Sequence, residues 1–294
     1  MNFMEIRSKM KSVSNIHHIV HSMETLATMK IIKLRTDVEK RKIYSTTLQR
    51  ILSGITSLLS EDLPENALLE SNKQEKRSLV LLFTSDRGFC GNMNPMLIGQ
   101  TRTFLREKPN SRIICIGKKA GNTIIQEGFN VLALIDKRLE NVDFHFAQNL
   151  ASDVVKGFLN QEYDSVYVSY MAFHNILIQK PTLKKIIPIE KLSQEVKTTK
   201  YHHDYESFII SPNSKAIFSF LARKYLDAIM FQILLEAATS EQAIRMMSMR
   251  SASDNAEKVF LKMKQDYQKM RQEKITRELI ELSSNLSSAK RRRS

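Results

Sequence analysis

Three histidines near the start of the chain have a spacing that could bind a metal ion. His17 and His21 are four residues apart and would share one face of a helix, as paired metal ligands on helices do. His18 lies between them. No carboxylate or cysteine completes the ligand set. We therefore interpret the three side chains as exposed or seam-lining helix residues and expect no metal site.

Two glycine-containing turns are candidates for phosphate binding. Gly88-Phe-Cys-Gly91 follows an apolar run, but it lacks the third glycine of the dinucleotide fingerprint, and no acidic residue is clearly placed to contact a ribose. Gly117-Lys-Lys-Ala-Gly121 does not fit the phosphate-loop pattern, which ends in Gly-Lys-Ser/Thr. We interpret both as structural turns and expect no nucleotide or other cofactor.

Catalytic groups do not assemble into a recognisable pattern either. No Ser/His/Asp or Cys/His arrangement stands out, and Cys90 and Cys115 lack the spacing of a metal or redox motif. We expect that this chain alone is not an enzyme. The alternative is an enzyme that uses the α/β middle of the chain, and it predicts substrate or nucleotide binding by the isolated chain.

The distribution of helix breakers indicates which elements must position these residues. No glycine or proline occurs from Asn213 to Ser294, and the first sixty residues contain only Gly54. Glycine costs about 1 kcal/mol and proline about 3 kcal/mol inside a helix. A helix from Asn213 to the mid-280s would be about 110 Å long at 1.5 Å per residue. The two ends of the chain therefore predict a rod, and the middle predicts a globular body.

Apolar residues at both ends follow the heptad spacing of a coiled-coil seam. His17 and Glu24 interrupt the N-terminal seam, and the C-terminal seam changes phase after Met270. Two such helices can bury both seams by pairing antiparallel. The seam residues are Ile6, Met10, Val13, Val20, Ala27, Ile31, Leu34 and Val38 in the first helix, and Ala256, Phe260, Met263, Tyr267 and Met270, then Ile275, Leu279, Leu282 and Leu286, in the second.

The middle of the chain alternates between strand-like and helix-like segments, which favours a mainly parallel sheet with right-handed crossovers. The expected strands are Ser78–Thr84, Arg112–Ile116, Asn130–Leu134 and Ser165–Tyr170, with later strands at Ile176–Gln179, Lys184–Pro188 and Tyr205–Ile210. The expected helices are Pro95–Glu107, Lys118–Glu127 and Phe144–Asn160.

The predicted fold is mixed α and β, with a long antiparallel two-helix coiled coil from the two chain ends and a central α/β domain. The expected domains are an N-terminal shaft helix over 1–60, a central α/β domain over 61–211 with a linker at 61–77, and a C-terminal shaft helix with a basic tip over 212–294.

Positive charge is concentrated on the predicted helices. Residues 1–60 hold ten basic and four acidic side chains, and residues 212–294 hold sixteen and nine, out of a net charge of +14. A basic shaft implies an acidic protein partner, a nucleic acid or an anionic surface. A basic coiled coil that binds nucleic acid is therefore an alternative function. The apolar runs are far shorter than a membrane span, and no signal peptide is visible, so we expect a soluble intracellular protein.

Three blocks of sequence resemble the gamma subunit of F-type ATP synthase. They match in order and approximate spacing over essentially the whole chain. The blocks are Ile6-Arg-Ser-Lys-Met-Lys-Ser-Val-Ser-Asn15 with Ser22-Met-Glu-Thr-Leu-Ala-Thr-Met-Lys30, then Thr84-Ser-Asp-Arg-Gly-Phe-Cys-Gly-Asn-Met-Asn94, and finally Ser240-Glu-Gln-Ala-Ile-Arg-Met-Met-Ser-Met249 with Ala252-Ser-Asp-Asn-Ala256 and Tyr267-Gln-Lys-Met-Arg-Gln-Glu-Lys-Ile-Thr-Arg-Glu278.

The resemblance implies a non-catalytic rotor shaft that couples ion flow to nucleotide cycling in the catalytic beta subunits. In that family the paired helices lie inside a ring of three alpha and three beta subunits. In that family the central α/β domain, which the resemblance implies to be Rossmann-like, contacts the epsilon subunit and the membrane rotor ring. The implied location is peripheral, on the cytoplasmic face of a bacterial inner membrane or the equivalent organelle face, and no nucleic acid is expected.

The matching motifs also imply roles for single residues. Met23 and Arg245 would lie near an acidic lever of the beta subunit, although Met23 could instead be a seam residue. Higher on the shaft, Arg271, Gln272 and Thr276 would contact beta-subunit catch loops, with a solvated helix face as the alternative for Arg271. A further set would form the turn at the top of the central domain, where Asp86 and Arg87 are expected to stabilise the fold rather than bear torque. That set is Asp86, Arg87 and Cys90.

The chain departs from the family pattern at three places. Histidines at 17–21 replace two cations that are typical of the shaft. Asn92 stands where the family has a second turn glycine. The family's small apolar end becomes Lys290-Arg-Arg-Arg293, which we expect to protrude or to be disordered.

Overall fold

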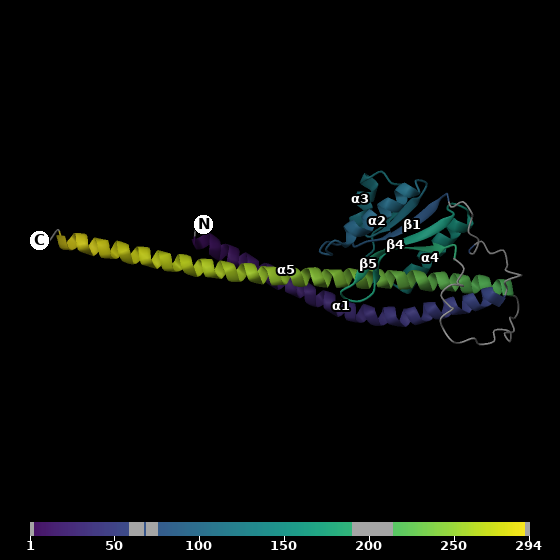
Figure 1. Ribbon diagram of the computed structural model, residues 1–294, viewed down its shortest axis with the longest axis horizontal. Coiled ribbons are helices and arrows are strands. Elements are labelled where there is room, and N and C mark those ends of the chain that lie inside the picture. The colour runs from purple at the N-terminus through teal and green to yellow at the C-terminus, as the bar shows by residue number, and fades with distance from the viewer. Residues whose placement is uncertain (1–2, 59–67, 69–75, 190–213, 292–294) are drawn as a thin grey trace. The chain divides into compact units, whose positions relative to one another are not determined.

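The computed structural model describes residues 3–58, 68, 76–189 and 214–291. Two long helices and a five-stranded sheet with shorter helices make up this part of the chain (Figure 1). The chain divides into two compact units, one of Met1–Leu26 with Met246–Ser294 and the other of Ala27–Arg245. Each unit is described by itself. The predicted domain boundaries near 60 and 211 lie outside the described residues.

The two ends of the chain form the long helices that the scarcity of helix breakers predicts. Helix α1 spans Phe3–Leu58 and helix α5 spans Ser214–Arg291. Gly54 is the one glycine inside them, and neither helix contains a proline. None of the described helices has a stretch long and apolar enough to cross a membrane.

The middle of the chain folds around one sheet with the strand order β3-β2-β1-β4-β5. The first four strands are parallel and β5 is antiparallel to β4. The predicted strands are confirmed with small shifts at their ends. The bounds are Ser78–Phe83 for β1, Arg112–Ile116 for β2, Val131–Ile135 for β3, Ser165–Phe173 for β4 and Gln179–Ile187 for β5.

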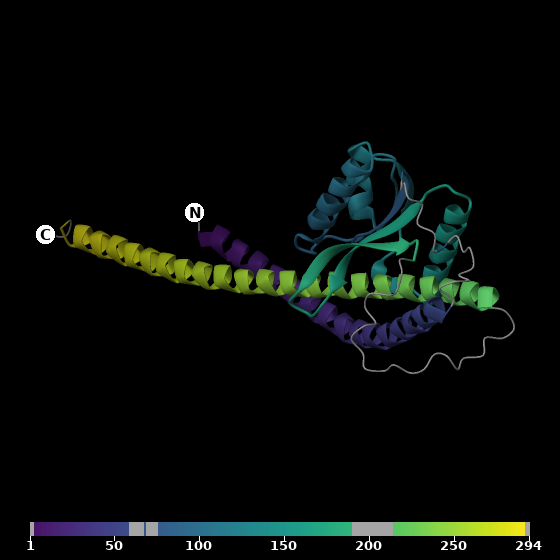
Figure 2. The same cartoon turned by 45° about the vertical axis from the view of Figure 1, so that its right-hand side comes forward.

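Helices cover both faces of this sheet. Helices α2 and α3 lie on one side of it and α4 on the other (Figures 1 and 2). Asp143 caps α4, since its side chain accepts a hydrogen bond from the backbone N–H of Phe146. The bounds are Met93–Glu107 for α2, Lys118–Gln126 for α3, Leu139–Asn141 for the short 3-10 helix η1 and Phe144–Leu159 for α4.

Strand β1 separates two apolar cores, and alternate residues point into each. Leu79, Leu81 and Phe83 join the core that contains α4, α1 and the first half of α5. Val80 and Leu82 join the core beneath α2 and α3. Since both faces are covered, all six residues of β1 are buried, which explains its unbroken apolar run.

The late strands differ from the prediction. Ile176–Gln179 and Lys184–Pro188 were expected as two strands, but β5 is a single strand that begins at Gln179 and contains Pro181. A proline lacks a backbone N–H and is tolerated on an edge strand, where one side of the backbone needs no partner. Strand β5 is such an edge. The expected strand at Tyr205–Ile210 lies outside the described residues.

Helices α1 and α5 pair antiparallel, as predicted. Within the unit Ala27–Arg245, Ser45 on α1 donates a hydrogen bond to Gln232 on α5, and Glu140 bridges Lys30 to Gln242. Residues later in α1 thus lie beside residues earlier in α5, as in an antiparallel pair. In the other unit, the Phe3 ring stacks on Tyr267 with a centroid separation of 4.6 Å.

The predicted seam is buried or half-buried along α1, and along α5 as far as Met270. Every seam position from Ile6 to Val38 is buried or half-buried, including His17 and Glu24. On α5 the seam is half-buried as far as Met270. All residues from 271 to 282, called here the tip of α5, are exposed, and among the described residues Ile275, Leu279 and Leu282 are not covered by a seam partner. The side chains of Leu286 and of the basic end lie outside the described residues.

Candidate functional site

The turn between β1 and α2 contains three of the predicted site residues and is closed by its own hydrogen bonds. Ser85 donates its backbone N–H to the Asn94 side chain at 3.1 Å, and Asn94 donates back to the Ser85 hydroxyl at 2.7 Å. The Ser85 hydroxyl in turn donates to the carbonyl of Arg87 at 2.7 Å. The side chain of Arg87 is exposed, whereas Cys90 is 3% exposed.

Backbone geometry explains part of this turn. Phe89 adopts a positive φ of 67° and Gly91 one of 49°, whereas Asn92 has φ −93°. The left-handed positions therefore fall on Phe89 and Gly91, so Asn92 replaces the family's second glycine without strain. Gly117 after β2 has φ 97°, and a Cβ there would lie 2.2 Å from the carbonyl oxygen of Thr84. Only glycine fits so close an approach, which gives this turn a structural role.

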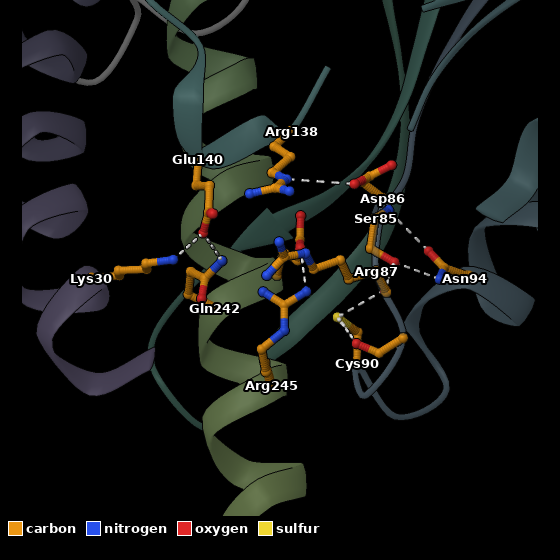
Figure 3. A network of polar contacts seen from close by, with 12 residues as sticks. Lys30, Ser85, Asp86, Arg87, Cys90, Asn94, Arg138, Glu140, Gln242 and Arg245 are labelled. Carbon is orange, nitrogen blue, oxygen red and sulfur yellow. Dashed lines mark hydrogen bonds and ion pairs between the residues drawn. The ribbon is translucent and has the colours of Figure 1, made fainter. Parts of the chain in front are cut away.

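Helix α5 lies at the carboxyl ends of the parallel strands, where open α/β folds usually bind ligands. Ile244 packs against the core beneath α2 and α3, and the neighbouring Arg245 is close enough to Cys90 to interact with it electrostatically. Figure 3 shows Arg245 of α5 facing the turn that carries Cys90. In this chain, helix α5 therefore lies beside the position where a related α/β fold would bind a nucleotide.

A buried ion pair lies at this contact. The Arg245 guanidinium is 2.6 Å from a carboxylate oxygen of Glu241, one helical turn earlier, and the two residues are only 9% and 5% exposed. Burial raises the pKa of Glu241, and Arg245 offsets only part of that effect. Burial opposes the charge on Arg245, but Glu241 nonetheless raises the pKa of the guanidinium. Burial also raises the pKa of Cys90 to about 11, and the Glu241 charge adds to this.

Two further contacts connect α1 and the segment after β3 to the same place (Figure 3). Glu140 in η1 lies 2.6 Å from the Lys30 ammonium of α1 and accepts a hydrogen bond from Gln242 of α5 at 3.0 Å. Arg138 lies 3.6 Å from Asp86. We call these seven residues the polar joint; its members are Lys30, Asp86, Arg138, Glu140, Glu241, Gln242 and Arg245.

The remaining predicted contact residues are on the unit formed by the two helix ends. Arg271, Gln272 and Thr276 are exposed on the tip, and the Thr276 hydroxyl donates to the Gln272 carbonyl at 2.9 Å. Met23 is half-buried on α1. Arg245 differs from them because its charge is paired inside the chain.

The histidine patch forms ring contacts rather than a ligand cluster. The rings of His17 and His21 stack with centroids 6.2 Å apart, and His21 lies 3.6 Å from a Glu24 oxygen. Among the described residues, no group of three or more histidine, cysteine or acidic side chains is arranged to hold a metal ion.

A cleft of about 710 Å³ lies between α1 and the turn that joins β4 to β5. Its polar lining includes Arg35 and Glu39, which pair with each other at 3.0 Å, together with Lys42, His174 and Asn175. These groups do not form a nucleophile and base in mutual contact, so the cleft gives no support to the enzyme alternative.

Sequence reasoning missed most of the polar joint. Lys30, Glu140, Glu241 and Gln242 were not singled out. The spacing of Glu241 and Arg245 is a usable signal, because an acidic residue four positions before a basic one forms a pair on a helix. No local pattern identifies Glu140, whose partners are 110 and 102 residues away along the chain.

Comparison with known proteins gives a consistent match. The sequence profile of the ATP synthase family matches residues 2–288. The ATP synthase gamma chain of Dictyoglomus thermophilum is 33% identical over 287 residues, and that of Dictyoglomus turgidum is 34% identical, each match covering 97% of both chains. The gamma chain of Legionella pneumophila (strain Corby) is 29% identical over 282 residues, covering 95% of this chain and 96% of the relative.

Solved structures share the fold. A chain of the Euglena gracilis mitochondrial ATP synthase, in an OSCP/F1/c-ring assembly, superposes with a TM-score of 0.66 at 19% identity and covers 97% of this chain and 94% of its own. A chain of the Tetrahymena thermophila central stalk and c-ring gives 0.61 at 20% identity, covering 80% and 99%. Because the profile spans nearly the whole sequence and two relatives exceed 30% identity, the chain belongs to the ATP synthase gamma chain family.

Proposed function

We propose that the chain is the central rotor shaft of an F-type ATP synthase. It couples ion flow through the membrane sector to the conformational cycle of the catalytic beta subunits, and it performs no catalysis itself. The observation that carries this proposal is the match to gamma chains over 97% of the sequence. A nucleic-acid-binding role receives no support from these relatives.

The geometry of the helices suits a mechanical role. A shaft must resist bending and twisting, and two antiparallel helices packed along an apolar seam do so better than one helix. The seam is buried or half-buried from Ile6 to Val38, and Gly54 is the only helix-interior glycine in either long helix. These features support torque transmission.

We propose contacts with the beta subunits at Met23, Arg271, Gln272 and Thr276. The exposure of the last three supports this assignment, because the chain itself leaves their side chains available. Exposed ion pairs contribute only about 0–1 kcal/mol each, which suits contacts that are remade at every rotary step. The contact of Arg245 with the acidic lever stays a prediction, and its burial with Glu241 favours a role inside the chain.

The proposed partners are three alpha and three beta subunits around the paired helices. The epsilon subunit and the membrane rotor ring would contact the domain built from β1–β5 with α2, α3, η1 and α4, called here the sheet domain. We place the turn with Asp86, Arg87 and Cys90 at the top of that domain. The proposed location is peripheral, on the cytoplasmic face of a bacterial inner membrane or the equivalent organelle face, and no nucleic acid partner is proposed.

Co-purification tests this function. The tagged full-length chain, expressed at native level in its host, should recover alpha and beta subunits in a ratio of about one to three to three, as the proposed assembly requires. The recovered complex should hydrolyse ATP. Recovery of nucleic acid that is released by salt, without alpha and beta subunits, would refute the proposal and favour the basic coiled-coil alternative.

A further inference from the structure

The polar joint brings together four segments that are distant in the sequence. Lys30 comes from α1, Asp86 from the turn after β1, Glu140 from η1 and Arg245 from α5. All of them lie in the unit Ala27–Arg245. The sheet domain is therefore connected to α1 by the Lys30–Glu140 ion pair and to α5 by the Gln242–Glu140 hydrogen bond, in addition to the apolar core.

Charge in the joint is balanced internally. Its three cations are Lys30, Arg138 and Arg245, and its three carboxylates are Asp86, Glu140 and Glu241. The inner pair of Glu241 and Arg245 is also the most buried, with side chains 7% and 11% exposed. Breaking a buried pair by removing one partner leaves an uncompensated charge, so this arrangement is costly to disturb.

Directionality distinguishes the joint from the apolar core. Hydrophobic packing is not directional, so on its own it tolerates small sliding of a helix on a sheet. Hydrogen bonds and close ion pairs depend steeply on distance and angle, and satisfied buried networks favour one arrangement. At the carboxyl edge of the sheet, the contacts of Glu140 with Lys30 at 2.6 Å and with Gln242 at 3.0 Å thus fix the position of α1 and α5.

We propose that the Glu241–Arg245 pair and Glu140, with its donors Lys30 and Gln242, are positioning residues that hold the sheet domain at one fixed angle on the two helices for torque transfer. This inference rests on the proposed function. It assigns Arg245 to a contact inside the chain. It also gives Glu140 and Glu241 a role in coupling. In that role neither residue needs to contact a nucleotide or a beta subunit.

The test uses the assembled complex in inside-out membrane vesicles. Glu241→Gln keeps the side-chain volume and removes the charge. Glu39→Gln makes the same change in the exposed Arg35–Glu39 pair, which has the same i,i+4 separation in the reverse order.

The measurements are ATP hydrolysis, ions taken up per ATP hydrolysed, and amide hydrogen exchange in residues 84–94. For Glu241→Gln we expect roughly tenfold faster exchange in that turn and a several-fold loss of ions per ATP, with hydrolysis retained. Glu39→Gln should match the wild type.

Further variants separate positioning from folding. The double variant Glu241→Arg with Arg245→Glu should restore part of the coupling, since it restores a pair. If Glu241→Gln fails to assemble, the milder Glu140→Gln is decisive and should lower ions per ATP about twofold. Unchanged ions per ATP in the assembled variants, or an equal loss in Glu39→Gln, would overturn the inference. Absence of alpha and beta subunits from the wild-type preparation would instead refute the proposed function.

Discussion

The polar joint and the tip of α5 contain the same balance of charge in opposite surroundings. Each has three basic and three acidic side chains. Both regions contain ion pairs within the chain, such as Lys274–Glu278 at 3.7 Å on the tip, but only the joint buries a pair. In the tip every residue from 271 to 282 is exposed, including Ile275, Leu279 and Leu282. Formal charge therefore does not distinguish a buried polar cluster from an exposed helix surface, whereas burial does.

The largest expected loss of stability comes from a substitution that breaks the buried ion pair of the polar joint. Arg245→Leu should cost about 3 kcal/mol in the free energy of unfolding, because Glu241 is left buried without its partner. Since burial raises the pKa of Glu241, the cost should be smallest at low pH, where the carboxyl group is protonated, and should grow as the pH rises through that pKa. Urea unfolding of the purified chain at several pH values measures both effects.

Arg35→Leu is the matched control for this variant. Arg35 and Glu39 are 58% and 65% exposed, so breaking their pair should change the free energy of unfolding by no more than about 0.5 kcal/mol. Equal costs for the two variants would show that burial does not distinguish the two pairs.

A smaller effect concerns the thiol beside the joint. Burial raises the pKa of Cys90 from 9.0 to about 11, so the folded chain keeps a proton that the unfolded chain loses. The resulting stability is fully present below pH 9 and is lost as the pH rises from 9 to 11, by about 2 kcal/mol at most. Cys90→Ser should therefore show a flatter decline in urea midpoint over this range. Parallel pH profiles for the two proteins would contradict the expectation.

The smallest effect should come from the tip. Leu279→Ala and Leu282→Ala should change the stability of the free chain by less than about 0.5 kcal/mol, because both side chains are about 60% exposed. Ile31→Ala, at a seam position only 3% exposed, should cost about 2–4 kcal/mol in the same urea experiment. A loss above about 1 kcal/mol in either tip variant would show that the chain itself covers this surface.

Local signals predicted the elements of the fold well. The absence of glycine and proline predicted α5 to within a residue of its start, and the apolar runs predicted β1 to β4 with small shifts at their ends. Two late strands were expected, Ile176–Gln179 and Lys184–Pro188, but the structure has one strand, Gln179–Ile187, which contains Pro181. A proline within a run argues against a strand unless that strand is an edge. Edge position depends on strand order, which a single segment does not contain.

The candidate site was only partly predictable. Asp86, Arg87 and Cys90 stood out through a resemblance to a known turn, whereas Glu140 lies in a segment without such a motif and Glu241 was not singled out within its matching block. Their importance comes from contacts across the fold, such as Glu140 with Lys30 at 110 residues of separation.

The sequence by itself determined two long helices, a parallel sheet between them and membership of a family of rotor subunits, because helix propensity, heptad spacing and motifs are local properties of the chain. Only the tertiary structure decided that Arg245 is buried while Arg271, on the same helix, is exposed. The physical reason is that desolvation depends on which distant segments cover a side chain. Near Arg245 the sheet and its turns supply that cover, whereas the part of the chain that the structure describes leaves every residue from 271 to 282 exposed.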